Sequence, residues 1–454
     1  MRFPAGQPGV VPKNRVRETT DFAGPGPARR HENIIVNYDD LPCPSERSVY
    51  TKEEKMKPMK SVVILLALLL AAMAMVPMVS AAGTAITPDV ATAIESNYVS
   101  PDTALQSATA AVKDFVGRNA LDENWNGATV NPKPNIIFDV NGKKLFYLFS
   151  VERKGGRIGE IKIAASKVLG SSVVTIGSGA QAIDLKNIRS KATEILNRQY
   201  KNAKIDSIDP VCYNYPNIGA IIRFTAAGSG STSLVIDAYD YSIVPAAGQV
   251  SFYDAIPPAD LTERAARWDS EQTALKTVSA QSLSPMATVT KTINGFTLYP
   301  QENTNWCSFA TAKMISAYYG YSRTQRGIAT TMGIANPDDG ASIETTRSNY
   351  YLNTVANGGL AKMGTSISYT GMFTYDNIVS EMNSNRPIHT DRYETSSYHA
   401  RAITGYSYTT TTPVSQYLYI YDPWPTTSGA VYWENWNVFS GQPNPVHAIL
   451  YVRN

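Results

Sequence analysis

The sequence predicts an α+β protein in which two α+β parts follow one another along the chain. Three observations support this prediction. Residues 83–258 alternate amphipathic helical patterns with short alternating strands. A helical pattern that begins at Cys307 opens the C-terminal part. Beyond Asn385 the sequence becomes rich in strands and in tyrosine, so residues 295–454 predict a helical portion followed by a β portion.

The N-terminus predicts export. Residues 1–58 have few apolar runs and many Pro, Gly, Arg and Glu, which is typical of disordered chain or of a misassigned start. A basic Met59-Lys60 pair then precedes the uncharged apolar run Ser61 to Val79, and small residues follow. This pattern predicts a signal peptide over 59–82 and a secreted or cell-surface protein. The alternative is a signal anchor, because about 19 apolar residues can just span a bilayer.

Residues 83–258 predict one helix across an antiparallel sheet, twice over. The first helix is expected at 104–115, with strands at 135–140, 144–152 and 159–165, and the second at 188–200, with strands at 218–227 and 233–244. This pattern resembles the cystatin-like propeptide modules of secreted peptidases. The alternative is a generic α+β adaptor or substrate-binding domain.

Residues 259–294 predict a connection between the two parts. Leu261 to Leu275 is a charged amphipathic helix. The Ser/Thr-rich segment 276–294 lacks a core pattern and is predicted to be a linker. Such segments are preferred sites of proteolytic nicking, so an activating cleavage is expected there.

The most informative stretch runs from Tyr299 to Gly320. Cys307 lies where a polar turn gives way to an apolar helix, and Gly320 is suited to end that helix. Unpaired backbone N–H groups at a helix start favour thiolate over thiol. The amide of Gln301 could reach back over the turn and form an oxyanion hole with the Cys307 N–H. The alternative is that Cys307 is a small buried hydrophobic residue, which is the usual role of a free cysteine.

A thiolate nucleophile needs a base, and the chain has four histidines. His399 begins a predicted strand, and the next strand ends at Asp422, whose carboxylate is placed to orient the imidazole. His447 is the competitor, but no acidic residue follows it. His389 is predicted to face outward from a strand, and His31 lies in the N-terminal tail.

These motifs resemble a known family. The series Q-x5-C-S-x-A-x3-M-x3-YYG, HA-x-x-I-x-GY and Y-x-YDP is similar to the papain-like cysteine peptidase superfamily, and most of all to its compact branch of bacteriocin leader-processing peptidases and secreted relatives. The resemblance covers residues 295–454. It implies Gln301 as oxyanion donor, Cys307 as nucleophile, His399 as general base and Asp422 as orienting acid. Ser308 departs from the pattern, because many relatives have glycine there.

Two residues beside the nucleophile, Trp306 and Ser308, are candidates for the substrate cleft. The net charge of +3 is spread along the chain, so no nucleic-acid partner is predicted. Three cysteines make no disulfide framework. The histidines lack paired ligand spacing, so no metal and no cofactor are predicted.

The sequence thus predicts a secreted cysteine peptidase made as a zymogen, with a protein or peptide as substrate and residues 83–258 as an intramolecular inhibitor. A membrane is predicted to be involved only through the signal segment. Two alternatives stay open. One is an amidase or transpeptidase acting on cell-wall or isopeptide bonds. The other is a catalytically inactive papain-like module that binds surfaces.

Overall fold

A computed structural model describes most of the chain beyond residue 86. The described residues are 87–179, 182–200, 202–226, 230–280, 288–336, 338–394, 397–410, 412, 414–441 and 446–454. All of them belong to one compact unit, which runs from Pro77 to Asn454. The predicted tail, the signal segment at 59–82 and residues 281–287 of the predicted linker lie outside the described residues. In the part of the chain that is described, no helix has the length and apolar character needed to cross a membrane.

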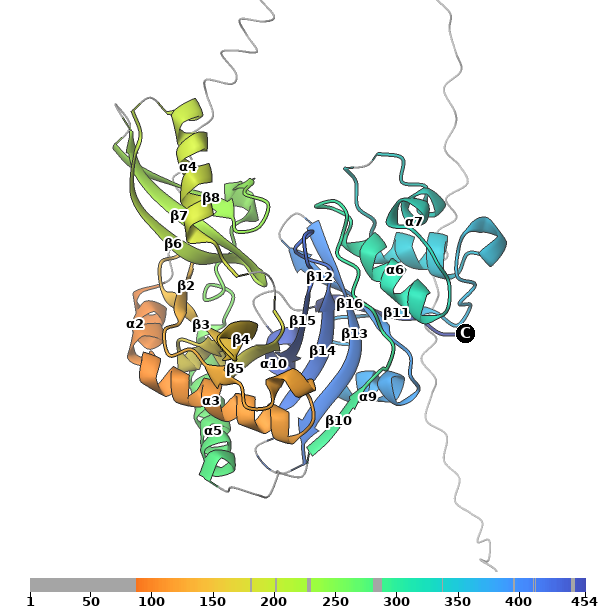
Figure 1. Cartoon of the computed structure of the whole chain (residues 1–454), viewed down its shortest axis with the longest axis horizontal. Coiled ribbons are helices and arrows are strands. Elements are labelled where there is room, and N and C mark those ends of the chain that lie inside the picture. The colour runs from red at the N-terminus through yellow and green to blue at the C-terminus, as the bar shows by residue number, and fades with distance from the viewer. Residues whose placement is uncertain are drawn as a thin grey trace, which may run out of the picture. The chain divides into compact units, whose positions relative to one another are not determined.

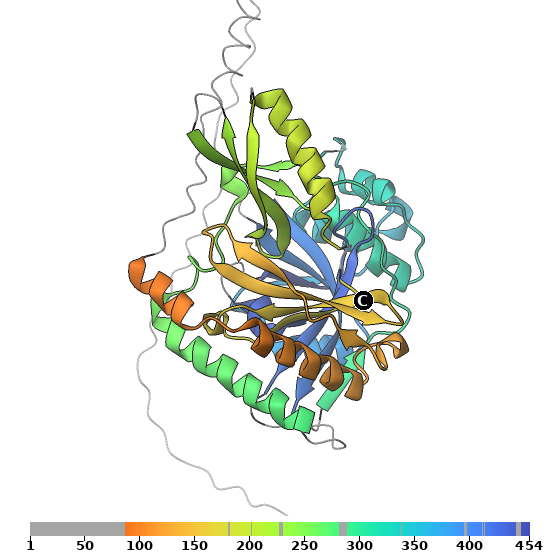
Figure 2. The ribbon, with the colours of Figure 1, turned by 60° about the vertical axis from the view of Figure 1, so that its left-hand side comes forward.

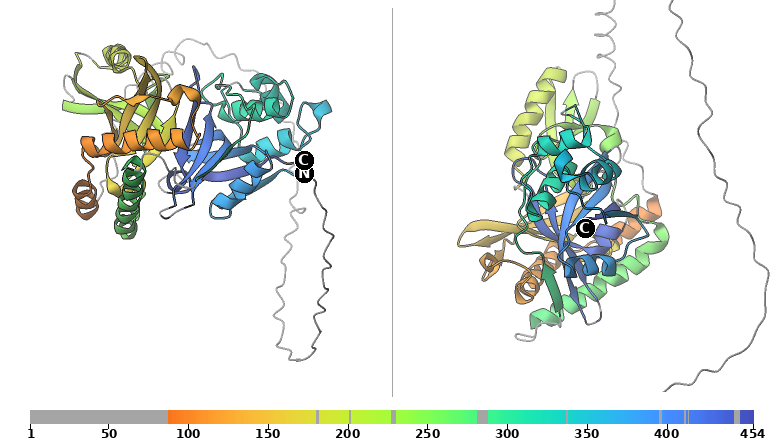
Figure 3. Two further views of the ribbon diagram at one scale, coloured as in Figure 1. Left: turned by 60° about the horizontal axis from the view of Figure 1, so that its bottom comes forward. Right: turned by 90° about the vertical axis from the view of Figure 1, so that its right-hand side faces the viewer.

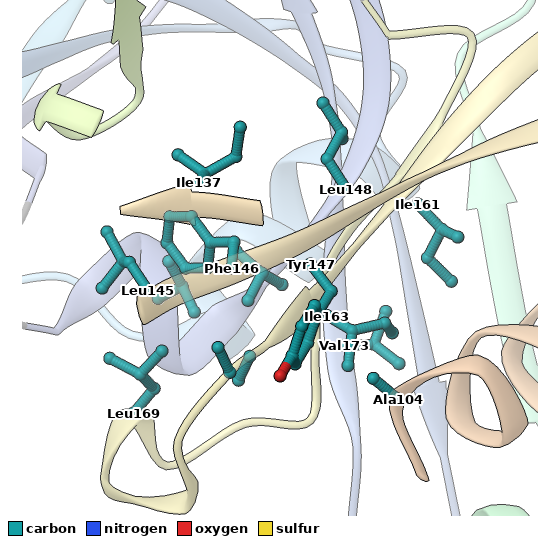
Figure 4. Packing of buried hydrophobic residues seen from close by; sticks show 14 of the residues in the cluster. Ala104, Ile137, Leu145, Phe146, Tyr147, Leu148, Ile161, Ile163, Leu169 and Val173 are labelled. Atoms are coloured by element: carbon teal, nitrogen blue, oxygen red, sulfur yellow. The ribbon is translucent and has the colours of Figure 1, made fainter. Parts of the chain in front are cut away.

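The first N-terminal layer is a helix packed on a sheet. Ser100 starts the long helix, because its hydroxyl accepts a hydrogen bond from the Thr103 N–H at 3.1 Å. The buried side of this helix, with Ala104, Ala108 and Phe115, packs on the strands in one apolar core. Figure 4 shows part of this core, with Ala104 of the helix among residues of the strands. The elements are α2 (Pro88–Ser96), α3 (Pro101–Gly117), η1 (Glu123–Trp125), β1 (Thr129–Val130), β2 (Asn135–Asp139), β3 (Lys144–Arg153), β4 (Gly156–Ala164), η2 (Lys167–Leu169) and β5 (Val173–Gly177).

The second layer repeats this arrangement with one helix over antiparallel strands (Figure 1). Its elements are α4 (Leu185–Gln199), β6 (Lys204–Asn214), β7 (Asn217–Ala226), β8 (Gly230–Asp237), β9 (Ile243–Val244), η3 (Ala246–Gly248) and η4 (Pro258–Asp260). Parallel pairing of β2 with β6 joins the two layers, with Phe138 opposite Val211. The two predicted helices are therefore present at their expected places, whereas α2, β5 and β6 were not predicted. The likeness to cystatin-like modules stays a hypothesis.

The connection between the two parts is more ordered than the sequence predicts. Helix α5 (Leu261–Ala280) lies beside α3 and against η2 (Figure 2). Strand β10 (Thr288–Thr292) then pairs with a strand of the C-terminal part, from Thr288 opposite Thr409 to Thr292 opposite Gly405. The prediction of a linker over 276–294 is therefore wrong at both ends, because polar side chains do not prevent a strand from pairing through its backbone.

The C-terminal part sets helices against an antiparallel sheet (Figure 3). The helical elements are α6 (Cys307–Tyr318), α7 (Gln325–Met332), α8 (Ile343–Thr346), the π-helical turn η5 (Arg347–Tyr351), η6 (Val355–Asn357), α9 (Tyr375–Asn383) and α10 (Trp436–Ser440). The strands are β11 (Ser366–Tyr369), β12 (Ile388–Glu394), β13 (Ser397–Thr409), β14 (Gln416–Asp422), β15 (Ala430–Asn435) and β16 (Val446–Tyr451), in the order β11-β16-β12-β13-β14-β15. Helix α6 packs on β13.

One continuous sheet joins the N-terminal and C-terminal parts. Strand β15 pairs with β5, with Trp433 opposite Ile176. Gly177 permits this approach, because a Cβ there would lie 2.4 Å from the Val431 carbonyl oxygen. The buried Trp433 indole donates a hydrogen bond to the Ala120 carbonyl at 2.7 Å and lies in the core built around α3. The N-terminal part therefore covers one face of β14 and β15.

Candidate active site

Cys307 is the first residue of α6. Its Sγ lies 3.5 Å from the carbonyl oxygen of Tyr398, the residue that precedes His399 in β13. The first four N–H groups of a helix have no partner within the helix, so the backbone at Cys307 offers donors and the positive end of the helix dipole. The fold thus brings the predicted nucleophile to the start of the strand that carries the predicted base.

His399 and Asp422 lie on neighbouring strands and are joined by a hydrogen bond of 2.7 Å between Nε2 and Oδ1. The same oxygen accepts from the Trp424 backbone N–H at 3.0 Å, and Oδ2 accepts from the Tyr432 hydroxyl at 2.8 Å. Burial raises the pKa of Asp422, but His399, Arg401 and the Trp424 N–H outweigh burial and leave the pKa below its ordinary value. Asp422 is therefore a buried carboxylate that stays ionised beside the imidazole.

Gln301 lies in the turn before α6, but its amide does not point freely at the sulfur. Its Nε2 donates to the carbonyl oxygens of Asn303 at 2.9 Å and Thr304 at 2.7 Å. Among the described residues, its buried Oε1 has no hydrogen-bond partner. The Gln301 backbone N–H donates to Pro423 at 3.0 Å, which ties the turn to the residue after Asp422. Donation to an oxyanion would require Nε2 to leave one of its two carbonyl partners.

The two residues predicted to line the substrate cleft are placed differently. Trp306 is 7% exposed, and its ring packs against Phe309 in the core around α6. Ser308 is 2% exposed and shares a hydrogen bond of 2.7 Å with the Thr346 hydroxyl. Both side chains face the interior because the first turn of α6 is buried on that side, and neither lines the cleft described below. Their role in substrate binding stays a prediction.

The other described histidines occupy different surroundings. His447 lies on β16 with its ring against Tyr369 and Tyr398. His389 is fully buried, and its Nδ1 shares a hydrogen bond of 3.1 Å with the Tyr351 hydroxyl. Burial lowers the pKa of His389 to about 3. The prediction that His389 faces outward is therefore wrong, because helices cover the side of β12 on which it lies.

An open cleft of about 440 Å³ lies next to His399. Gln301, His399 and Trp424 form one side of it. The other side comes from the N-terminal part, with Asp237 and Asp240 among its residues. Trp424 was not among the predicted site residues, although its position two residues after Asp422 pointed to the site.

A buried network of charged side chains extends from Asp422 and was missed by the sequence analysis. The Arg401 guanidinium donates to the Tyr432 hydroxyl at 2.9 Å and to Glu434 at 3.0 Å. Arg392 donates to the other oxygen of Glu434 at 3.3 Å. The signal for these residues was present, because Arg401 follows His399 by two positions and so shares its face of β13.

A cysteine at a helix start, close to the strand that carries a buried His–Asp pair, is the arrangement expected of a papain-like cysteine peptidase. Comparison with protein families supports this class, because residues 293–444 match the model of the Peptidase_C39 like family. No curated protein matches the chain. In the described residues, no group of three or more His, Cys, Asp or Glu side chains is arranged to hold a metal ion.

Proposed function

We propose that this protein is a secreted cysteine peptidase that hydrolyses peptide bonds through a thioester on Cys307. The observation that supports this most is the placement of the Cys307 thiol against the strand residue before His399, whose imidazole is held by the buried Asp422 carboxylate. Nε2 of the ring is directed at Asp422, which leaves Nδ1 as the nitrogen that serves the thiol.

The chemistry follows from this arrangement. His399 takes the thiol proton, and the thiolate attacks the substrate carbonyl carbon. Donors at the start of α6 stabilise the oxyanion, and the imidazolium returns its proton to the leaving amine as the thioester forms. A water that loses a proton to the same imidazole then releases the acid product and restores the thiol. Gln301 joins the oxyanion hole only if its amide turns away from the Asn303 or Thr304 carbonyl.

The test is a thiol-directed affinity probe, with mass mapping of the labelled residue and a fluorogenic peptide assay. We expect Cys307 to react well below the pH at which an ordinary thiol reacts. The His399→Ala variant should lose this reactivity, whereas the His447→Ala variant should keep it. Labelling that depends on His447 and not on His399 would overturn the assignment of the base.

Two finer proposals concern the substrate. The similarity of the motifs to bacteriocin leader-processing peptidases suggests a peptide substrate, whereas amidase or transpeptidase chemistry would use the same thioester. Mass analysis of products formed with and without an added amine distinguishes hydrolysis from transpeptidation. A surface-binding module without catalysis predicts no turnover and no selective labelling of Cys307.

Export is also a proposal, because the Met59 to Ala82 pattern carries it alone. In a secreting host the mature protein should begin near Ala82 or Gly83. Recovery of membrane-embedded protein that retains residues 61–79 would favour the anchor instead.

The N-terminal part was predicted to be either an inhibitory propeptide or an adaptor. The shared sheet and the burial of Trp433 in the N-terminal core favour the adaptor, because a dissociating inhibitor would expose both. We therefore propose that any activating cleavage between residues 276 and 294 leaves the N-terminal part bound.

A further inference from the structure

Tyr215 links the N-terminal part to the catalytic pair. It lies in the turn between β6 and β7, and its ring packs in the N-terminal core against Phe146 and Phe252. Its hydroxyl reaches out of that core and donates to Glu434 Oε1 at 2.8 Å. At 2% exposure, this hydrogen bond is shielded from water.

From Glu434 an unbroken series of hydrogen bonds runs to the imidazole. Glu434 Oε2 accepts from Arg401 at 3.0 Å, and Arg401 donates to the Tyr432 hydroxyl at 2.9 Å. Tyr432 donates to Asp422 at 2.8 Å, and Asp422 holds His399 at 2.7 Å. None of these side chains is more than 9% exposed. Each link therefore acts in a low dielectric, where hydrogen bonds to charged groups are strong and polarise one another.

The charged groups of this network balance one another. Two carboxylates, Asp422 and Glu434, face two guanidinium groups, Arg392 and Arg401. Glu434 has to hold both arginines, and the Tyr215 hydroxyl is the neutral donor that shares its Oε1 with Arg392. Without this hydroxyl, Glu434 loses one of the donors that fix its Oε1, and the carboxylate can rotate between the two guanidinium groups that it binds. Arg401 would then move away from Tyr432, which orients Asp422.

We propose that Tyr215 is a positioning residue for the catalytic pair, so that the N-terminal part is an obligatory component of the active enzyme. This inference rests on the proposed peptidase function. Tyr215 takes no direct part in the reaction at Cys307. Its effect on His399 passes through Glu434, Arg401 and Tyr432. This role goes further than that of an adaptor, because the N-terminal part then contributes to the chemical step.

The test uses Tyr215→Phe in the full-length protein, with Tyr253→Phe as the matched control. Tyr253 is another buried tyrosine of the N-terminal core, and its hydroxyl donates to the Lys144 carbonyl at 2.6 Å, outside the network. We expect Tyr215→Phe to lower kcat about 3- to 20-fold with little change in KM, as is typical of positions in a coupled network. Tyr253→Phe should leave both constants unchanged.

A double-mutant cycle separates positioning from loss of stability. If Tyr215 acts through Tyr432, then Tyr215→Phe should change kcat less than about twofold in a Tyr432→Phe background. A merely structural effect would multiply with that of Tyr432→Phe. Equal effects of Tyr215→Phe in both backgrounds, or equal effects of Tyr215→Phe and Tyr253→Phe, would overturn the proposal.

The rate of Cys307 alkylation at pH 6 gives a second measurement that needs no substrate. It depends on the thiolate fraction, and hence on how the imidazole is held. We expect it to fall several-fold in Tyr215→Phe and to stay unchanged in Tyr253→Phe. If the wild type hydrolyses no peptide, the peptidase function fails, while the alkylation rates still decide the role of Tyr215. An unchanged alkylation rate in folded Tyr215→Phe contradicts it.

Discussion

The Asp422 carboxylate shows how strongly one side chain depends on its surroundings. It accepts hydrogen bonds from the His399 ring, the Trp424 N–H and the Tyr432 hydroxyl. We expect Asp422→Asn to lower kcat/KM by about 10²–10⁴, because an amide cannot stabilise the imidazolium and can select the wrong tautomer. Peptide hydrolysis measures this loss. Asp376 is an exposed residue in the first turn of α9, so Asp376→Asn is the control and should leave kcat/KM unchanged.

The same carboxylate predicts a pH effect on stability. The pKa of Asp422 in the folded protein is below its ordinary value. The ionised carboxylate therefore contributes fully to the free energy of unfolding above the pKa of this carboxyl in the unfolded chain, about 4. The contribution is lost as the pH falls through the lower folded pKa. In urea unfolding, the wild type should lose more stability than Asp422→Asn between pH 5 and pH 2. Parallel curves would contradict this account.

His389 predicts a pH effect in a higher window. It is buried and neutral with a pKa lowered to about 3. Between about pH 6.5 and pH 3 the unfolded chain takes up a proton that the folded protein does not. The free energy of unfolding is therefore unaffected by His389 above pH 6.5. Below that pH it decreases, by about 2–3 kcal/mol at pH 4.5. His389→Gln should remove this fall in urea unfolding, whereas His447→Gln, at a half-buried position, should retain it.

At the scale of helices and strands, the sequence predicted those elements whose patterns are local. Helix α6 follows from apolar residues at three- and four-residue spacing, and Gly320, with φ of +84°, takes the left-handed conformation that ends it. Strand β6 was missed because Asp206, Asp209 and Pro210 interrupt its pattern. Strand β10 was missed because its residues are polar and its pairing with β13 is distant in sequence.

The charged network was missed for a physical reason of the same kind. Alternation in a strand normally separates a buried face from a solvated one, so the charged residues Arg401 and Glu434 would be expected on the solvated face. Both are fully buried here, because Glu434 lies against Arg392 and the Tyr215 hydroxyl, and Arg401 lies over the Phe439 ring. The candidate nucleophile, base and orienting acid could be proposed from their motifs, whereas the side chains around them depend on contacts that the sequence of one part does not reveal.

Helix α5 carries a buried carboxylate that predicts a stabilising substitution. Glu271 accepts a hydrogen bond from the Ser172 N–H at 2.8 Å, yet burial raises its pKa to about 7. Between about pH 4.5 and pH 7 the folded protein holds a proton that the unfolded chain releases, so stability falls as the pH rises. Glu271→Gln should therefore gain stability relative to the wild type at pH 8, by up to about 3 kcal/mol, and less at pH 5.

Urea midpoints at the two pH values measure this gain. Glu263→Gln on the exposed side of α5 is the control, since it removes only a surface pair with Arg267. A Glu271→Gln protein that is equally destabilised at both pH values would show that the hydrogen bond to Ser172 outweighs the cost of burying the charge.

In the whole molecule, the two parts depend on each other for their cores. Trp433 and Tyr417 belong to the C-terminal sheet but pack in the core around α3. A fragment of residues 288–454 would expose them together with the edge of β15 that pairs with β5. We expect this fragment to aggregate or to bind a hydrophobic dye. A soluble, fully active fragment would contradict both the adaptor role and the role of Tyr215.

Cleavage between the two parts is different from removal of one of them. A specific protease site introduced at residues 281–287 cuts the chain after α5 and before β10, while the contacts of β5 with β15 and of Tyr215 with Glu434 lie elsewhere. We therefore expect the two fragments to elute together from a sizing column and kcat to stay within about twofold, since the network that orients His399 is unchanged. The same cut in Cys307→Ala, which tests association without self-digestion, should give the same elution. Release of the C-terminal fragment with a large rise in activity would instead support the hypothesis of an inhibitory propeptide, because activity rises on dissociation only if the dissociating part is an inhibitor.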